Sequence, residues 1–188
     1  MKITMACYQA VSMIHGGPRV QILRTKQELE KLGVEVSLFD PWRPFSETTC
    51  ELFHLFSANV GTFHLARNVQ SLHLPMVTSP IFFTRHSPGF IRSSLSVEHA
   101  LKRFRSGIWT DYGYTEQICR WSRAVLPNTS DESRLINKGL GIPKETISVV
   151  PNGVESRFEF GDPALFKKKY GCDGNHYGSH RGNNIRIY

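Results

Sequence analysis

Two adjacent glycines near the start of the chain are the first motif that could bind a ligand. Gly16-Gly17 follows an apolar segment over 2–8 and precedes Pro18, a residue suited to the first turn of a helix. Glycines let a ligand approach the backbone closely, and the free N–H groups at the start of a helix favour a phosphate. We therefore interpret Gly16-Gly17 as a candidate phosphate-binding loop, with a plain flexible turn as the alternative.

Polar side chains near the ends of later apolar segments provide further candidates. Arg85 can hold an anion and His86 can transfer a proton near neutral pH, although a solvated loop would also explain both residues. Asn59 and Asn128 could bind a polyol, or could instead cap helices. Ser79 opens the loop that carries Arg85 and His86.

The motifs of several other functional classes are incomplete. The dinucleotide-binding G-x-G-x-x-G is absent, although Asp40 follows the second predicted strand, where a ribose-binding acid would lie. His15-Gly16-Gly17 is similar to an oxyanion-hole segment of lipases, but the chain has no G-x-S-x-G for a serine nucleophile. Cys172, His176 and His180 are spaced by four within a glycine-rich stretch that would not hold a helix. We therefore expect adventitious metal binding there at most, and we predict no metal site.

Composition limits the class of protein and of partner. The 188 residues are 40% hydrophobic and 21% charged, which is typical of a globular protein of one domain or a little more. The four cysteines are far apart and lack a C-x-x-C, so buried reduced thiols are expected. The net charge of +7 favours anionic partners, namely phosphates, nucleic acid or a membrane surface. Aromatic and basic residues are not interleaved, which argues against nucleic acid.

The expected location follows from the apolar segments. No run approaches a membrane span, and the N-terminus does not resemble a signal peptide, so a cytoplasmic location is the default. The basic, amphipathic stretch 92–109 carries Val97, Leu101, Phe104 and Ile108 on one face. It would either lie on an anionic membrane, as a peripheral contact, or pack on the core of the protein.

Apolar segments alternate with helical patterns along most of the chain. We expect strands over 2–8, 34–38, 52–57, 76–83, 124–126 and 146–150. The first predicted helix follows Pro18 and shows an apolar face of Val20, Leu23 and Leu32, with Ile22 and Leu29 nearby. Such alternation predicts an α/β fold, a Rossmann-like parallel sheet flanked by helices.

The character of the chain changes near its C-terminus. Residues 171–184 contain no aliphatic side chain, so they cannot contribute to a core and are predicted to be disordered. We therefore divide the chain into a Rossmann-like domain over 1–161, and a linker remnant with a disordered tail over 162–188.

Several segments together resemble one enzyme family. These are Gly16-Gly17, Gly33-Val34-Glu35-Val36, Val125-Leu126-Pro127-Asn128-Thr129-Ser130 and Ile147-Ser148-Val149-Val150-Pro151-Asn152-Gly153-Val154-Glu155. In this order and spacing they resemble the N-terminal domain of a family 4 glycosyltransferase, which has the two-lobed GT-B architecture. The resemblance covers residues 1 to about 171.

The resemblance implies a reaction and a set of roles. Such enzymes transfer a sugar from a nucleotide diphosphate sugar to an acceptor, such as a sugar or glycolipid, and many members need no metal or other cofactor. The glycine-rich loop, here Gly16 and Gly17, would face the donor diphosphate. The lobe holds the acceptor, so Asn59, Ser79, Arg85, His86 and Asn128 become candidate acceptor-binding residues. The turn at Asn152-Gly153 would lead into the second lobe.

Two departures from the family pattern affect the expected activity. The segment Val77-Thr78-Ser79-Pro80-Ile81 lacks the histidine that many members carry, so no catalytic residue is assigned. A nucleotide-binding lobe does not follow, which leads us to expect a truncated or frame-shifted product without turnover of its own. The alternatives are a non-catalytic Rossmann-like module that binds nucleotides or phosphate, and an interaction protein of the membrane surface.

Overall fold

The computed structural model describes most of the chain and divides it into two units. It describes residues 1–13, 16–104, 107–153, 164, 168, 178–181 and 184–187. The first unit is Met1–Asn152 and the second is Gly153–Tyr188. The domain boundary predicted between residues 161 and 162 lies outside the described residues.

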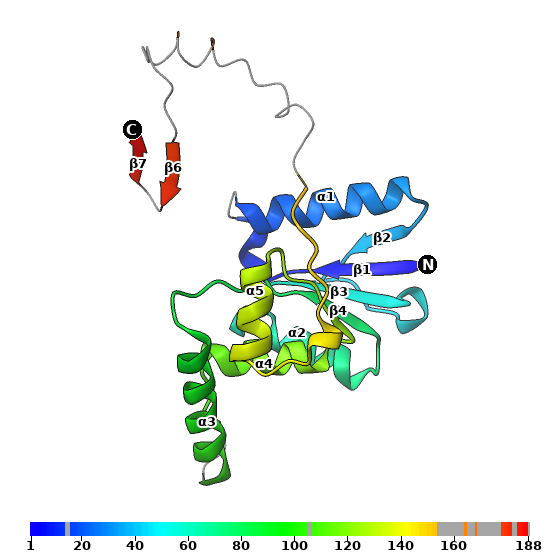
Figure 1. Ribbon diagram of the computed structural model, residues 1–188. Coiled ribbons are helices and arrows are strands. Elements are labelled where there is room, and N and C mark those ends of the chain that lie inside the picture. The colour runs from blue at the N-terminus through cyan, green and yellow to red at the C-terminus, as the bar shows by residue number, and fades with distance from the viewer. Residues whose placement is uncertain are drawn as a thin grey trace. The chain divides into compact units, whose positions relative to one another are not determined.

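The first unit is built on a five-stranded parallel sheet (Figure 1). Its strands are β1 (Lys2–Ala6), β2 (Glu35–Leu38), β3 (Leu52–Phe56), β4 (Met76–Ser79) and β5 (Ala124–Val125). They lie in the order β2-β1-β3-β4-β5, and every pair is parallel. This confirms the predicted α/β fold with a Rossmann-like sheet. Because β1 lies between β2 and β3, the chain leaves β1 in one direction and β3 in the other.

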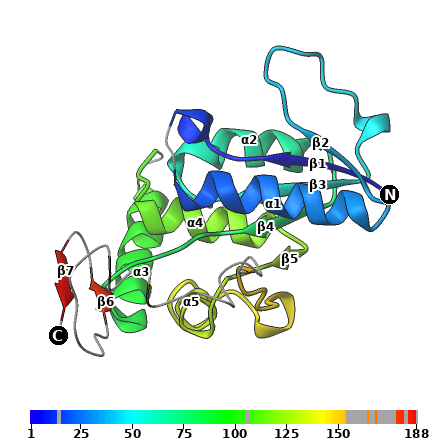
Figure 2. The ribbon, with the colours of Figure 1, turned by 90° about the horizontal axis from the view of Figure 1, so that it is seen from above.

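Helices cover both faces of this sheet (Figures 1 and 2). One face packs on α1 (Gly17–Lys31), through a cluster that includes Met5, Ile22 and Phe56. The other face packs on α2 (Val60–Ser71) and α4 (Asp111–Trp121), which contribute to the larger apolar cluster around Phe53 and Leu55. Two further helices, α3 (Pro88–Phe104) and α5 (Ser130–Arg134), follow β4 and β5, and α5 continues into a π-helical turn at Leu135–Gly139.

Two predicted strands differ most from their expected ranges. The run 76–83 ends as a strand at Ser79, since Pro80 has no N–H to donate and Ile81 has a left-handed backbone with φ +50°. The sixth strand predicted over 146–150 is only a single parallel bridge, between Val125 and Ile147. The two-residue β5 offers little edge for longer pairing.

The apolar face predicted for the first helix is partly wrong. Ile22 is buried and Leu29 packs against the same cluster, but Val20, Leu23 and Leu32 are exposed. Ile22 and Leu29 are two helical turns apart and point to the same side, so a face centred on them leaves the other three apolar residues in solvent.

The long basic helix also differs from its predicted range of 92–109. It begins at Pro88 and ends at Phe104, so Ile108 and Trp109 lie beyond it. Gly107 has φ +90°, a left-handed conformation that a helix cannot continue through. No helix among the described residues has the length and apolar content needed to cross a membrane.

The second unit is described only in part. Gly178–Arg181 (β6) and Asn184–Ile187 (β7) pair as antiparallel strands. The alternation of Asn184, Ile185, Arg186 and Ile187 is typical of a strand. The rest of the segment predicted to be disordered lies outside the described residues, as do Cys172 and His176 of the weak metal motif.

The three cysteines in the described part of the chain are free thiols, as predicted. Cys50 and Cys119 are buried and Cys7 is half-buried. Burial raises the pKa of the Cys119 thiol to about 12 and that of Cys7 to about 11. Within the described ranges, no cluster of three or more His, Cys, Asp or Glu residues could hold a metal ion.

Candidate functional site

The loops at the carboxyl ends of the strands form one rim of the sheet. In open α/β sheets, ligands bind at this edge, where the strand order reverses. Here the reversal lies between β1 and β3. Two neighbouring hollows open on this rim, and the segment Ile81–Thr84 after β4 lines both.

The first of these, here the switch-point hollow, has a volume of about 780 Å³. It is lined by Tyr8 after β1, by Ser57–Gly61 after β3 and by Thr110–Tyr112 at the start of α4. A Cβ atom on Gly61 would lie 3.2 Å from the Cβ of Tyr8. The loops after β1 and β3 are therefore in close contact at the point where the strand order reverses.

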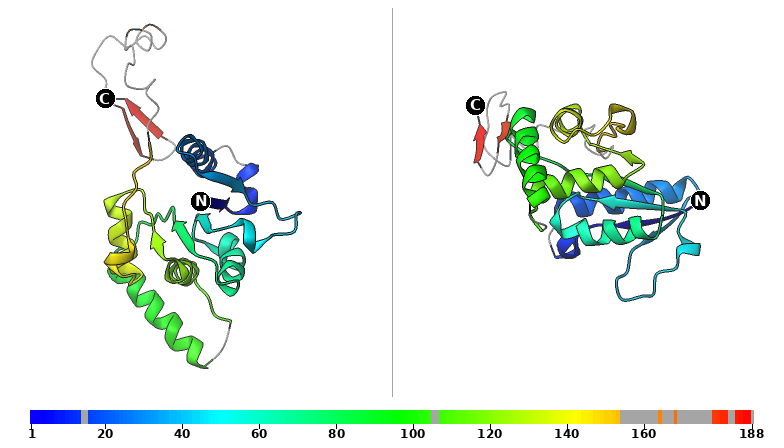
Figure 3. Two further views of the ribbon diagram at one scale, coloured as in Figure 1. Left: turned by 90° about the vertical axis from the view of Figure 1, so that its right-hand side faces the viewer. Right: turned by 90° about the horizontal axis from the view of Figure 1, so that it is seen from below.

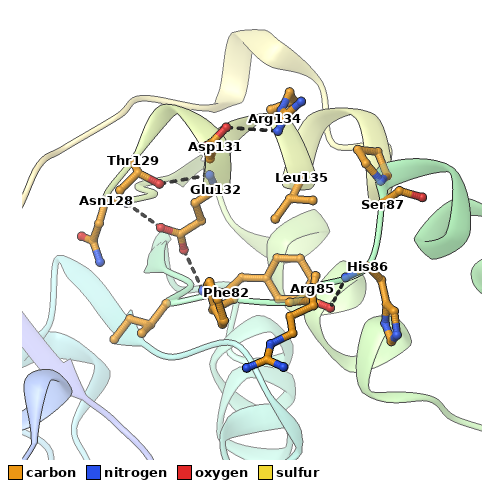
Figure 4. Close-up of a pocket in the computed structure, with 14 residues that line it drawn as sticks. Phe82, Arg85, His86, Ser87, Asn128, Thr129, Asp131, Glu132, Arg134 and Leu135 are labelled. Carbon is orange, nitrogen blue, oxygen red and sulfur yellow. Dashed lines mark hydrogen bonds and ion pairs between the residues drawn. The ribbon is translucent and has the colours of Figure 1, made fainter. Parts of the chain in front are cut away.

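The second, here the α5 hollow, has a volume of about 720 Å³ (Figure 4). It lies between the loop Ile81–Pro88 and the turn and helix from Asn128 to Leu135. Both volumes fall in the range of sites that bind small molecules, which is roughly 300–1,000 Å³.

A buried carboxylate holds the two walls of the α5 hollow together (Figure 4). Glu132 Oε1 accepts a hydrogen bond from the N–H of Phe82, and Oε2 accepts one from the N–H of Asn128, both at 2.7 Å. Burial raises the pKa of Glu132, although these two N–H donors act in the opposite direction. The loops after β4 and β5 are thus joined by one side chain, which we call the Glu132 clamp.

Sequence analysis did not identify the Glu132 clamp, although a signal was present. Thr129-x-x-Glu132 has the spacing of a helix capping box, and Thr129 Oγ1 does accept from the N–H of Glu132 at 3.1 Å. In a complete capping box, the Glu132 carboxylate would return to the N–H of Thr129. It binds Asn128 and Phe82 instead, and Phe82 is 50 residues away in the chain.

The predicted phosphate loop lies on this rim, at the start of α1. Gly16 is the N-cap residue and Gly17 is the first residue of the helix. A Cβ atom on Gly17 would meet nothing within 4 Å, so packing does not require glycine at this position. One turn further on, Gln21 Nε2 donates to Asn128 Oδ1 at 2.9 Å. This hydrogen bond connects α1 to a residue that lines the α5 hollow.

Arg85 and His86 both line the α5 hollow, but they differ in how far neighbouring residues hold their side chains. Arg85 is exposed, has no ion-pair partner among the described residues, and points away from α5 (Figure 4). His86 Nδ1 lies 2.5 Å from the hydroxyl of Tyr112, and its ring packs against Phe90. Arg85 is therefore the more available of the two for an anionic ligand.

Other predicted candidates are engaged in local structure. Asn59 caps α2, since its Oδ1 accepts from the N–H of Gly61, while its Nδ2 donates to Ser57 Oγ. Ser79 is buried beside His54 and lines neither hollow. Asp40, at the position where a ribose-binding acid would lie, accepts from the N–H of Trp42 two residues further on. Asn152 and Gly153 are exposed where the two units meet in the sequence.

Two residues on the rim have strained backbones. Ser57 follows β3 with φ +71°, and Ile81 follows β4 with φ +50°. A left-handed conformation is unusual for any residue with a side chain and most unusual for a β-branched one. Such strain is concentrated at functional sites, where the surrounding structure maintains it.

A buried histidine beneath the rim predicts a pH-dependent stability. Burial lowers the pKa of His54 to about 4, from an ordinary 6.5. The unfolded chain therefore binds a proton at this residue between pH 6.5 and pH 4, while the folded chain does not. We expect the free energy of unfolding to fall by about 1.6 kcal/mol between pH 6.5 and pH 5 from this group.

Urea denaturation across this pH range tests the prediction. The variant His54→Gln should lose this part of the slope, whereas His64→Gln, at an exposed position on α2, should retain it. Equal slopes for the native chain and His54→Gln would show that His54 is not held neutral in the fold.

Comparison with known proteins finds distant structural likeness but no match of sequence. No protein-family model and no curated protein matches this chain. Among solved structures, the chain is similar to the crystal structure of Anabaena Alr3699/HepE in complex with UDP, with a TM-score of 0.49 and 13% sequence identity. The match covers 91% of this chain and 50% of the other, so this chain spans about half the length of that protein. The fold assignment rests on the observed strand order.

Proposed function

We propose that this chain is the acceptor-side lobe of a nucleotide-sugar-dependent glycosyltransferase of the family 4 type. In this proposal the α5 hollow receives the acceptor, while Gly16 and Gly17 face the diphosphate of the donor. The nucleotide itself would be held by a second lobe.

The observation that carries the proposal is the meeting of separate segments on one rim. Gly17 and Gln21 come from the first crossover, Asn128 follows β5, and Arg85 follows β4. These residues are far apart in sequence, and the parallel sheet brings them to the edge where α/β proteins bind ligands.

The chemistry available on the rim is that of binding and charge stabilisation. The N–H of Gly17 lies at the positive end of the α1 dipole, which favours an anion. Arg19 is exposed in the same helical turn and adds a cation that sequence analysis did not single out. These groups would stabilise the charge that develops on a leaving diphosphate, and Arg85 and Asn128 would position the acceptor.

Binding of nucleoside diphosphates to the native chain and to Gly17→Ala tests the proposal. Alanine fits the open space at this position and favours a helix, so the fold should be as stable or slightly more stable. The added methyl group would obstruct close approach to the backbone. We expect weak, millimolar affinity for UDP, GDP or ADP, and about tenfold weaker binding by the variant, equal to about 1.4 kcal/mol.

Phosphorus NMR titration measures these affinities, with Gly89→Ala as the control. Gly89 lies in α3, where a Cβ atom would make only an ordinary contact with Ser87 at 3.9 Å, so this variant should bind like the native chain. Micromolar binding would favour the non-catalytic nucleotide-binding module instead. An affinity unchanged by Gly17→Ala, or no binding at all, would contradict the proposed role of the loop.

A further inference from the structure

Helix α3 has a second apolar side that the protein does not cover. Ile91 and Leu95 are buried and attach the helix to the core. Phe90, Val97, Leu101 and Phe104 are 51%, 60%, 45% and 90% exposed. The apolar face predicted from the sequence for Val97, Leu101 and Phe104 is thus real, but it does not pack on the core.

These four side chains form one continuous stripe. Their separations of seven, four and three residues place them on the same side of a helix, over about four turns. The helix extends away from the sheet, so that the end carrying Phe104 is free of the other helices of the first unit (Figures 1 and 3). Single exposed apolar residues are ordinary, whereas a contiguous exposed stripe marks an interaction surface.

The exposed charges of α3 are all positive. Arg92 and Arg103 are exposed and have no ion-pair partner among the described residues. Glu98 is the one acidic residue of the helix, and it is buried and paired with Lys102. The sequence as a whole carries a net charge of +7. A second copy of this chain would be repelled by that charge, whereas an anionic surface would be attracted.

We propose that α3 docks on an anionic membrane surface, with the stripe inserted at the boundary between headgroups and acyl chains. The apolar side chains supply the burial, while Arg92 and Arg103, on the side of the helix turned from the stripe, add to the positive charge that draws the protein to an anionic surface. The helix lies on the bilayer and does not cross it. None of the four stripe residues lines either hollow of the rim, so the proposal goes beyond the proposed function.

Co-sedimentation with lipid vesicles tests this docking without any nucleotide sugar. We expect the native chain to bind vesicles of phosphatidylcholine mixed with phosphatidylglycerol, and not vesicles of phosphatidylcholine alone. The double variant Leu101→Ser/Phe104→Ser should bind at least about tenfold more weakly, since each side chain loses its burial in lipid. Arg92→Gln/Arg103→Gln should weaken binding by a smaller factor, since both arginines lie on the side of the helix turned from the stripe, and added salt should weaken binding by the native chain.

Trp42→Ser is the matched control. Trp42 is 92% exposed in the loop after β2, so its loss removes a large apolar side chain from outside the stripe. This variant should bind like the native chain, and circular dichroism should show native folds for all variants.

Three outcomes would overturn the proposal. They are no binding to the anionic vesicles, equal binding to the neutral ones, and an equal loss in Trp42→Ser. A dimer in sedimentation velocity that Leu101→Ser/Phe104→Ser abolishes, without vesicle binding, would assign the stripe to a second copy. Failure of the proposed function would leave these results unchanged, because they measure only attachment to lipid.

Discussion

Replacing Gly113 by alanine is expected to lower the free energy of unfolding by about 3 kcal/mol or more, the largest effect that we predict for a single methyl group. The added Cβ atom would overlap Glu98 Oε1 and would lie 2.6 Å from the carboxyl carbon. This carboxylate is buried and cannot simply move aside. It accepts hydrogen bonds from the N–H and the hydroxyl of Thr110 and pairs with Lys102.

The charge of Glu98 makes its displacement costly. Burial alone would raise the pKa of Glu98, but the bonds from Lys102 and Thr110 hold it below the ordinary value. The group is therefore ionised at neutral pH, and moving it would leave a buried charge with fewer partners.

Urea denaturation of Gly113→Ala beside Gly17→Ala measures this effect. Both changes add one methyl group to a helix, but only the first meets a filled space. Gly17→Ala should match or slightly exceed the native stability. A Gly113→Ala chain as stable as the native one would mean that Glu98 does not occupy the place described.

Removal of the Glu132 clamp is expected to have the second-largest effect. In Glu132→Ala, the N–H groups of Phe82 and Asn128 lose their acceptors, so we expect a loss of about 2–3 kcal/mol in the free energy of unfolding. The walls of the α5 hollow would also lose the side chain that joins them. Exchange of the Phe82 and Asn128 amide protons should accelerate accordingly.

Two further variants separate the clamp from helix capping. Glu132→Gln keeps one acceptor but places an amide NH₂ against the second N–H donor, so it should lose an intermediate amount of stability. Asp131→Asn alters an exposed carboxylate whose partner is Arg134, three residues away, and should cost less than about 0.5 kcal/mol. Equal losses for Asp131→Asn and Glu132→Ala would indicate an effect on the start of α5 and not on the clamp.

The sheet could be predicted because the residues within each strand are enough to indicate that strand. Segments such as Val36 in β2 and Leu55 in β3 belong to short apolar runs between helical patterns, and parallel pairing follows from that alternation. The predictions that failed concern residues whose structure depends on contacts with segments distant in the sequence. Ile147 makes one bridge because its partner strand β5 is two residues long. The length of β5 cannot be read from residues 146–150 themselves.

The helices show a different limit of sequence reasoning. The apolar side chains of α1 and α3 lie on more than one side of each helix, so periodicity alone cannot indicate which of them meet the core. In α1, Ile22 packs against the sheet, and Leu23 remains in solvent. In α3, Ile91 and Leu95 pack into the core, and the periodic stripe ending at Phe104 remains in solvent.

The candidate site could be predicted as a set of loops but not as a set of contacts. The carboxyl ends of strands carry Gly17, Arg85 and Asn128, and the topology alone brings them to one rim. Whether a polar side chain there is free depends on neighbours distant in sequence. Ser79 is engaged by His54, and Glu132 reaches Phe82 across 50 residues.

Amide chemical-shift mapping during titration with UDP, GDP and ADP tests the central claim most directly. If the strand-end rim faces the donor diphosphate, the shifts should concentrate at Gly17, Arg19 and Gln21, with smaller changes at Thr84 and Arg85. Shifts concentrated at the opposite edge of the sheet, at Gly33, Glu51 and Arg123, would contradict this account.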